Sequence, residues 1–537
     1  MSITSLPLEL LNFICEYLEP QDWGALRITC RHIHGNTLEA YTTRYFKRIS
    51  LLLTREGLDR LEHIASSKTL RGSVEEIWII PNLFESGIRL DKAKFTNMEN
   101  RNHQLRWGGI STMAKSDETQ AELLAFVVYK AIMKEQQAIL DSWGFFGTLE
   151  KCLPRLENAV TFGVRFHATH FLLNTAKHSD LTCLGLRELK SQFNYSVYKT
   201  FPMIQRVPYM LYDLPFSQLL NAIIKSNRKV QALQTCGHAF RAFRSDRLCG
   251  MNLKSFQLPE SEYQLLLPLL KDLTTLHMCI RLKEYEQESF DEKTFKRLLN
   301  VLVTVAPTLK TLTFAQWSPI EELSPLYFKN LSQRIQFSQL EELDLHSIEV
   351  TVNSLEEFLR TAAPTLKRLS LELVSIVDGI TSAPDLGPIT ENSGSWVSAL
   401  SAEVKNDMQG LWKRVFESWA QHLKLQYVQL CNLGYRGRYI KLRDHLYTQR
   451  GQLDAQPSPG PNSKPDAQPS VLNPLSISFD AERASIPFEK WITQLEIEMW
   501  HRTFFGDSTL PGTRDINVRQ PGREFSGQVT YACSFGR

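Results

Sequence analysis

Apolar residues in the first fifty positions recur at helical spacing. One helix face is predicted at Leu10, Leu11, Ile14 and Leu18. Pro7 fits the first turn of that helix, because the amide hydrogen that proline lacks has no partner there. Glu9 places a negative charge near the positive end of the helix, and Pro20 breaks the pattern. The pattern therefore predicts a short amphipathic helix.

Two more short helices are expected after Pro20. Asp22 can cap the second helix, and Leu26 with Cys30 forms an apolar stripe that ends before Gly35. A third helix is expected from Thr37. Three helices of this size cannot bury all of their apolar faces on one another, so part of that surface is predicted to meet a partner.

These residues carry a resemblance to a known family. The matching positions are Leu6-Pro7-Leu8-Glu9-Leu10-Leu11, Ile14, Tyr17-Leu18, Asp22, Leu26-Arg27 and Cys30-Arg31. Residues 4 to 45 resemble the F-box motif, with Trp23 as a departure where a smaller aliphatic residue is more usual. The resemblance implies docking on a Skp-type adaptor and, through it, a cullin–RING ubiquitin ligase. The positions implied to contact the adaptor or to shape that surface are Leu6, Pro7, Glu9, Leu10, Ile14, Leu18, Leu26 and Cys30.

The rest of the chain alternates helix-like and strand-like segments. Helical spacing over 54–65 precedes a buried strand with Val74, Ile77, Ile79 and Ile80. The pattern Leu-x-x-Leu-x-Leu favours a strand, because its last two leucines share one face only when the chain is extended. It begins at Leu340 and again at Leu366, a spacing within the period of leucine-rich repeats.

Looser copies of the pattern recur at irregular intervals. They are Leu181, Leu184, Leu186; Leu253, Phe256, Leu258; Leu273, Leu276, Met278; Leu309, Leu312, Phe314; and Leu425, Val428, Leu430. The pentapeptide Ala-Pro-Thr-Leu-Lys stands at 306–310 and again at 363–367. Each copy follows a predicted helix that proline ends, and Ser354 with Glu357 suggests a capping box before the second.

The predicted fold class is therefore α/β, with an N-terminal three-helix F-box followed by an irregular solenoid of strand-plus-helix units. This body resembles leucine-rich repeats, although the asparagine or cysteine typical of the repeat is mostly missing. A generic α/β domain with leucine-rich strands is the alternative. Strands stacked in such an array form a long surface suited to binding other proteins.

Polar segments divide the chain further. Residues 97–120 and 375–406 are expected to be surface insertions, and 451–474 a disordered linker rich in proline. The expected domains are 1–50, the F-box; 51–450, the repeat body; 451–474, the linker; and 475–537, a C-terminal segment that can dock on the body. Its apolar run from Trp491 to Trp500 fits either a strand or a helix.

Composition limits which partners and which cellular compartment are expected. A formal net charge of +3 on 537 residues gives no basic field for nucleic acid. The most apolar segment, 121–133, is too short and too charged to cross a membrane and is expected to be a core helix. The amino terminus has no secretory pattern, and nine scattered cysteines without a CxxC pair are expected to be reduced and mostly buried. A cytoplasmic or nuclear protein is predicted.

Signatures of catalysis are missing from the sequence. No phosphate-binding glycine loop, nucleophile elbow or HExxH motif is found, so no catalytic residue, metal site or cofactor is predicted. His167 with His170 lacks a third ligand, and Cys236, His238 and Cys249 lack the second half of a zinc site.

Two basic clusters are candidates for substrate recognition. Arg241, Arg244 and Arg247 recur every three residues, and Arg436 with Arg438 follows a predicted strand and precedes Lys441 and Arg443. Guanidinium groups bind phosphate and carboxylate in bidentate fashion, so either cluster would suit an acidic or phosphorylated segment. A solvated charged face is the plainer interpretation of both.

The function predicted from these features is a non-catalytic substrate-recognition subunit of a Skp–cullin–F-box ubiquitin ligase. The F-box helices would hold the adaptor and the body would hold a protein substrate, whose lysines are thereby brought close to a ubiquitin-loaded enzyme. The alternative is an interaction scaffold that binds the adaptor without delivering substrates for ubiquitination.

Overall fold

A computed structural model gives the fold. It describes residues 3–18, 20–80, 127, 131–132, 134–164, 183–185, 210–235, 251–281, 292–317, 324–377, 402–435, 438–443 and 476–503. These residues form two compact units, Met1–Pro319 and Ile320–Arg537, and each unit is described by itself.

The first unit opens with four α-helices rather than the three predicted. A 3₁₀ turn η1 (Ile3–Ser5) precedes α1 (Leu8–Glu16), α2 (Pro20–Thr29), α3 (Arg31–Asn36) and α4 (Leu38–Phe46). The predicted second helix is two helices, because the Cys30 sulfur accepts the Ile33 amide at 3.5 Å and caps a new start. The Asp22 cap was wrong, since α2 already begins at Pro20 and Asp22 lies in its first turn. The helix expected from Thr37 is confirmed as α4.

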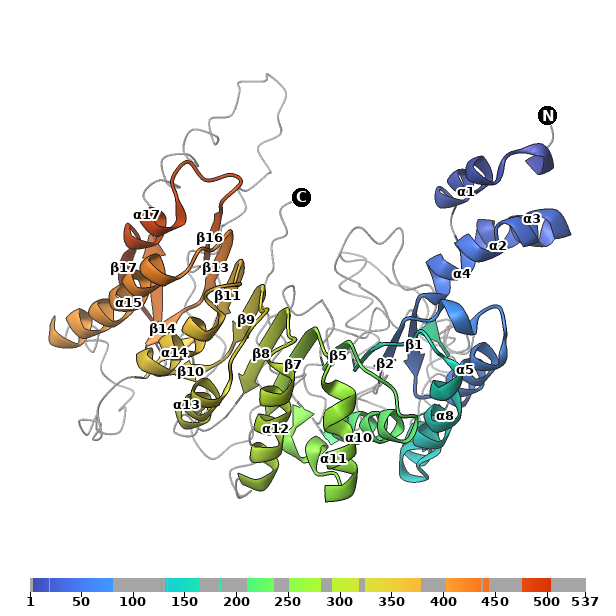
Figure 1. The fold of residues 1–537 in the computed structure, drawn as a ribbon, viewed down its shortest axis with the longest axis horizontal. Helices are drawn as coiled ribbons and strands as arrows, with labels where there is room; N and C mark the ends of the chain where they lie inside the picture. The colour runs from blue at the N-terminus through green and yellow to red at the C-terminus, as the bar shows by residue number, and fades with distance from the viewer. Residues whose placement is uncertain are drawn as a thin grey trace, which may run out of the picture. The chain divides into compact units, whose positions relative to one another are not determined.

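A parallel sheet forms the centre of the first unit (Figure 1). Its strands are β1 (Arg48–Leu52), β2 (Glu76–Ile80), β3 (Thr161–Val164), β5 (Ala232–Gln234), β7 (Thr275–Arg281) and β8 (Thr311–Trp317), with β4 (Cys183–Leu184) beside β1 and β6 (Met251–Asn252) beside β7. One register row is wholly apolar and buried: Ile49, Ile77, Phe162, Leu233, Leu276 and Leu312. This row faces the helices and forms the core.

Helices connect these strands and pack on one another. They are α5 (Arg55–Ser66), α8 (Gly144–Cys152), α10 (Met210–Lys225), α11 (Glu260–Leu270) and α12 (Glu292–Val305), with 3₁₀ turns η2 (Arg71–Ser73), η3 (Leu153–Arg155) and η9 (Leu253–Phe256). Figure 1 shows them along one side of the strands. Thr54 caps α5 by accepting the Gly57 amide at 3.1 Å. The predicted helix at 54–65 and the strand after it are confirmed.

The second unit repeats the strand-and-helix plan. Strands β9 (Glu342–His346), β11 (Arg368–Glu372) and β13 (Tyr427–Cys431) are parallel, and β16 (Ser476–Asp480) is antiparallel to β13. Leu343 pairs with Leu369 and Leu345 with Leu371, so the two full copies of the leucine pattern lie side by side. The helices are α13 (Ser324–Arg334), α14 (Val352–Ala362), α15 (Ala402–His422) and α17 (Phe488–Thr493).

A second sheet follows the ends of these strands. It consists of β10 (Glu349–Val350), β12 (Ser375–Ile376), β14 (Gly434–Tyr435), β15 (Arg438–Arg443) and β17 (Glu496–Thr503). Between the two sheets, Ser347, Leu373 and Asn432 adopt the left-handed conformation, with φ of 52°, 56° and 52°. The next residue in each repeat is apolar and buried, at Ile348, Val374 and Leu433.

This turn explains why the typical asparagine of the repeat is mostly missing. The Ser347 amide donates to the Glu372 carbonyl at 2.9 Å, and the Leu373 amide to the Cys431 carbonyl at 3.0 Å. Backbone groups of one repeat therefore satisfy those of the next, and no side-chain amide is needed for that purpose.

The predicted α/β class with leucine-rich-repeat-like units is confirmed, and most of the predicted strands are present. The prediction of a strand at residues 253–258 was wrong, because residues 253–256 form η9, which packs on α10 and α12. The copy at Leu181–Leu186 gives only the two-residue strand β4, and the structure describes only 183–185 of it.

Other corrections concern caps and loops. The cap of α14 is Thr351, which exchanges bonds with Ser354, so the Ser354–Glu357 box was wrong by one turn. The predicted loop at 375–406 begins in β12 and ends inside α15, and its centre is outside the described residues. Residues 97–120 and 451–474 also lie outside the described residues, as does most of 121–133. The run from Trp491 to Trp500 contains both α17 and β17.

Candidate protein-binding site on the N-terminal helices

Pro7 sets the start of α1. Its backbone, with φ −54° and ψ 150°, is extended, and its carbonyl accepts the Leu11 amide at 3.0 Å. Glu9 lies in the first turn, where a negative charge is favourable. The sequence Leu-Pro-x-Glu therefore favours a helix that begins at residue 8.

The inner face of α1 packs into a small aromatic core. Cys15 lies with Trp23 and Tyr45 in one buried cluster, and Leu18, Leu26, Ala40, Tyr41 and Phe46 pack around it. The Trp23 ring meets the rings of Tyr41 and Tyr45 edge to face, with centroids 5.6 and 5.4 Å apart. Trp23 thus packs against two aromatic side chains of α4.

Two arginine side chains lie at the edge of this core. The Arg27 guanidinium lies 4.0 Å from the centre of the Tyr41 ring, and Arg44 donates to the Glu16 carbonyl at 3.0 Å. Burial lowers the pKa of Arg27 from its ordinary value and raises the pKa of the Cys15 thiol. The Cys15 thiol is therefore a neutral packing group.

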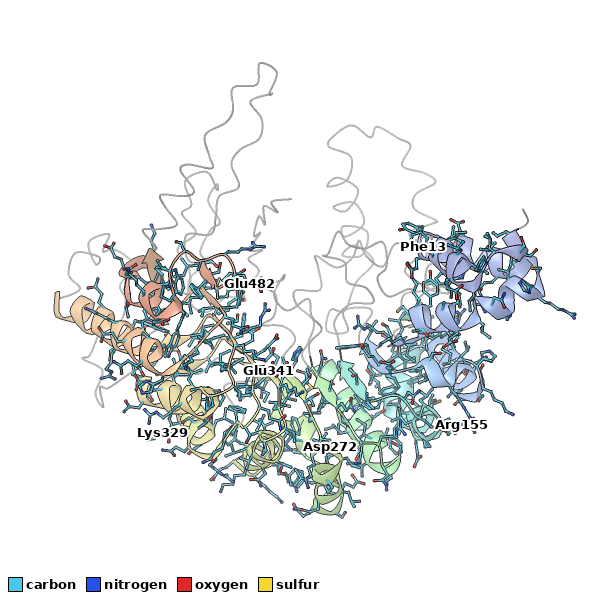
Figure 2. The ribbon with its side chains drawn as sticks, turned by 45° about the horizontal axis from the view of Figure 1, so that its top comes forward. Phe13, Arg155, Asp272, Lys329, Glu341 and Glu482 are labelled. Atoms are coloured by element: carbon cyan, nitrogen blue, oxygen red, sulfur yellow. The ribbon has the colours of Figure 1, made fainter. Side chains whose placement is uncertain are left out.

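The outer face of α1 is also apolar, but it is open to solvent. Leu8, Leu10, Phe13, Ile14 and Tyr17 are all exposed large apolar side chains. Figure 2 shows Phe13 at the surface of the N-terminal helices. Soluble domains seldom leave such a row exposed unless another molecule covers it. The helix therefore has one apolar face for its own core and one for a partner.

The predicted adaptor-contacting residues divide between these two faces. Pro7, Glu9, Leu10 and Ile14 are exposed, and Leu6 is half-buried. Three others are half-buried: Leu18 and Leu26 pack on the Trp23 cluster, and Cys30 caps α3. The outward set holds the candidates for direct contact, and the inward set shapes the helices that present it.

Sequence reasoning missed Phe13. Leu10, Phe13, Ile14 and Tyr17 stand at i, i+3, i+4 and i+7, so helical spacing alone could have found the outer stripe.

Comparison with known families agrees with this geometry. The F-box domain model matches residues 3–34, so this chain carries an F-box domain. An F-box domain binds a Skp-type adaptor and so links its chain to a cullin, which places this chain among components of Skp–cullin–F-box ubiquitin ligases. F-box proteins are typically non-catalytic adaptors in these assemblies.

The family match covers only the N-terminal helices. No curated protein matches the chain. The matched residues end at 34, whereas α4, which supplies Tyr41 and Tyr45 to the Trp23 core, ends at Phe46. The folded helical unit is thus longer than the matched segment.

The described residues offer no metal site. Within them, no group of three or more His, Cys, Asp or Glu side chains converges on one point. The described cysteines are thiols, of which Cys30 is partly exposed and five are buried: Cys15, Cys152, Cys183, Cys279 and Cys431. His167, His170, Cys236, His238 and Cys249 lie outside the described residues. In the same described part of the chain, no helix is both long and apolar enough to cross a membrane.

Most residues of the two predicted basic clusters lie outside the described residues. Arg241, Arg244, Arg247 and Arg436 lie outside the described residues. Arg438 and Arg443 are the first and last residues of β15, and only their backbone is described. Lys441 lies between them, opposite Glu498 of β17.

Proposed function

We propose that this protein is a substrate-recognition subunit of a Skp–cullin–F-box ubiquitin ligase, acting in the cytoplasm or the nucleus. The observation that carries the proposal is the F-box at residues 3–34 with an outward apolar face, joined to a large strand-and-helix body. The helices would hold the adaptor and the body, a leucine-rich-repeat-like array, would hold a protein substrate. The chain would contribute proximity and no bond chemistry of its own.

The divisions of the chain follow from this proposal. Residues 1–50 would serve the adaptor, and 51–450 the substrate, with 475–537 completing the body. The arginine clusters at 241–247 and 436–438 are our candidates for contacting an acidic or phosphorylated substrate segment.

The test is substrate turnover in cells that express the full chain or its Leu6→Ala, Pro7→Ala variant in place of the endogenous protein. Leu6 is half-buried and Pro7 is exposed, and both directly precede α1, so the residues of the body are unchanged. A substrate should bind both forms, but its ubiquitination should fall and its half-life lengthen only with the variant. If proteins bound by the body keep the same half-lives and ubiquitination in both cells, the chain is a scaffold that delivers no substrate.

A further inference from the structure

Basic residues collect along one edge of the sheet in the first unit. Five segments there lead from a helix into a strand: 67–75 before β2, 153–160 before β3, 225–231 before β5, 271–274 before β7, and 306–310 before β8. Their basic residues are Lys68, Arg71, Arg155, Lys225, Arg228, Lys229, Lys271 and Lys310. Their acidic residues are only Glu75, Glu157 and Asp272. These five segments, called the basic edge below, are thus far more positive than the nearly neutral chain.

The five segments lie side by side, because their strands are neighbours in the sheet. One backbone hydrogen bond joins each segment to the next. The Val160 amide donates to the Glu75 carbonyl at 3.0 Å, and the amides of Gln231, Thr274 and Lys310 each donate to the preceding segment at 2.8 Å. Neighbouring strands are about 4.8 Å apart, so the basic edge is about 20 Å long.

Side chains hold the segments at this spacing. The Asn158 side-chain amide donates to the Gly72 carbonyl at 2.6 Å, and the Thr308 hydroxyl donates to the Lys271 carbonyl at 2.9 Å. The Arg228 guanidinium donates to the Leu156 carbonyl at 2.7 Å. The charges of the basic edge are therefore carried on a fixed backbone.

Most of these charges point to solvent without a partner of their own. The lysines that are exposed and form no ion pair among the described residues are Lys68, Lys225, Lys271 and Lys310. Lys229 pairs with Asp272 at 3.2 Å, but both side chains stay more than half exposed. Arg155 and Asp272, labelled in Figure 2, belong to two of the five segments, and Arg155 donates to the Ser66 hydroxyl at 2.9 Å.

Helix dipoles explain only part of this pattern. A cation is favoured in the last turn of a helix, and this accounts for Lys225 at the end of α10 and Lys271 at the end of α11. Lys310 lies well beyond Val305, where α12 ends, and directly before β8. The interactions within the fold therefore give no reason for its charge.

The basic edge suits a partner whose negative charges are spread along an extended chain. Lysine is a flexible point charge, whereas a single phosphate is better matched by the fork of an arginine. Lysines spread over about 20 Å match about six residues of an extended peptide, which rises about 3.3 Å per residue.

Two other kinds of anionic partner fit less well. The five segments contain no aromatic residue on which the bases of a single-stranded nucleic acid would stack. None of the exposed large apolar side chains of the described residues lies in them, and a membrane interface is usually entered by such side chains.

Resting on the proposed function, we infer that the basic edge binds an extended run of aspartate and glutamate residues in the protein substrate. This surface lies wholly on described residues of the first unit and is separate from the arginine clusters at 241–247 and 436–438.

The experiment measures the fluorescence anisotropy of a labelled peptide of about eight alternating aspartate and glutamate residues, titrated with the full-length chain. A peptide with asparagine and glutamine in their place is the neutral probe. The chains compared are wild type, the edge variant Lys271→Glu, Lys310→Glu, and the control variant Lys134→Glu, Lys293→Glu. Thermal unfolding of each chain checks that the fold is kept.

The control variant changes the net charge by the same amount away from the basic edge. Lys293 is exposed near the start of α12, the end opposite to segment 306–310. Lys134 is exposed, and its neighbour Glu135 accepts the Arg55 amide at the start of α5, the end opposite to segment 67–75. Both controls lie beyond the screening length of physiological salt, which is about 8 Å.

We expect the wild type to bind the acidic peptide and not the neutral one, with an affinity that falls as salt is added. The edge variant should bind at least about fivefold more weakly, and the control variant should stay within about twofold of the wild type. All three chains should bind the Skp-type adaptor equally, because the F-box residues are unchanged.

The contrary results separate this inference from the proposed function. If the wild type does not bind the acidic peptide, or if the edge and control variants bind it equally well, the inference is wrong while adaptor binding still supports the proposed function. If the wild type does not bind the adaptor, the proposed function fails, and the basic edge loses its role as a substrate site. Tighter binding of a neutral peptide with one phosphoserine, of oligothymidine or of phosphatidylserine vesicles, lost in the edge variant, would also overturn the inference.

Discussion

Helices α1 and α14 have similar lengths, but they use their apolar residues differently. In α14, Val352, Leu355, Phe358 and Leu359 are all buried, and none of its large apolar side chains is exposed. In α1, only Leu11 and Cys15 are buried, and an equally apolar face remains outside. Apolar residues thus serve folding in the repeat body, whereas the F-box helix divides them between folding and binding.

The ends of the two helices show the same difference. Thr351 and Ser354 exchange bonds at the start of α14 at 3.1 and 3.2 Å, so its first turn is satisfied by its own side chains. Pro7, at the start of α1, makes no side-chain cap bond. The helix α1 therefore depends on the Trp23 core for its stability, and losses there should reach the binding face.

The largest effect is expected in the core of the body. Phe358 packs on Phe328 and Phe337, with ring centroids 5.1 and 5.2 Å apart. Phe358→Ala should lower the free energy of unfolding of the second unit by about 3–5 kcal/mol, measured by urea denaturation. Phe13→Ala, the same change at an exposed position of α1, should shift the free energy of unfolding of the first unit by less than about 0.5 kcal/mol. Equal effects of the two substitutions would contradict the comparison.

Trp23 lies in the buried core on which the inner face of α1 packs. Trp23→Leu restores the residue size usual for the motif but removes both ring contacts to α4, so we expect about 2–4 kcal/mol of local destabilisation. Hydrogen exchange should rise across residues 8–46 and stay unchanged in β9 and β11. Unchanged exchange in α1 and α4 would mean that the aromatic core does not hold these helices.

A smaller effect is expected at a glycine in the first sheet. A Cβ on Gly163 would lie 2.6 Å from Cζ3 of the Trp78 ring and 2.8 Å from the Gln234 carbonyl oxygen. Gly163→Ala should therefore destabilise the first unit by about 1–3 kcal/mol, read from the unfolding midpoint. The matched change Gly24→Ala, in α2 with no atom within 4 Å, should be neutral or stabilise by up to about 1 kcal/mol. The prediction fails if Gly163→Ala is as well tolerated as Gly24→Ala.

Ion pairs across the starts of neighbouring strands give the next smaller effect. Lys47 and Arg48 face Glu75 and Glu76 in the first unit, and in the second unit Lys367 lies 2.7 Å from Glu341. Glu341→Lys should cost about 0.2–1 kcal/mol at low salt, and adding Lys367→Glu should recover most of it. Failure of the double variant to recover stability would show that the ion pair contributes nothing to the stability of the unit.

The smallest effect concerns a buried thiol. Desolvation, with Glu62 nearby, raises the pKa of Cys152 from 9.0 to about 12. Because the folded state disfavours the thiolate, the contribution of this thiol to stability is present below the ordinary thiol pKa and is lost as the pH rises toward 12. At mildly alkaline pH, iodoacetamide should modify Cys152 only after unfolding, and the partly exposed Cys30 well before it, as followed by mass spectrometry. Labelling of Cys152 at the unfolded rate in native protein would contradict this.

Much of the fold could be predicted because its signals are local or periodic. The leucine pattern at 340 and 366 gave the paired strands β9 and β11, since alternation of buried residues fixes both strand and face. The split of the second N-terminal helix at Cys30 could not be predicted, because a sulfur cap has no strong sequence preference. The left-handed turns at Ser347, Leu373 and Asn432 share no residue type, and backbone bonds to the next repeat hold those at Ser347 and Leu373.

The candidate site was predicted in part. The motif located α1 and the residues Leu10 and Ile14, but Phe13 was missed because it has no place in the motif. Exposure decides its role, and exposure depends on which face the Trp23 core buries. That core includes Tyr41 and Tyr45, which lie beyond the matched segment.

The most direct test of the division between folding and binding is a titration of the full-length chain with a Skp-type adaptor, beside its Leu6→Ala, Pro7→Ala variant. We predict that the wild type binds tightly and that the variant loses binding while its unfolding midpoint stays the same. If the folded wild type does not bind, the outer face of α1 is not an adaptor surface and the account is wrong. If the variant binds equally well, Leu6 and Pro7 take no part in adaptor binding, which also contradicts the account.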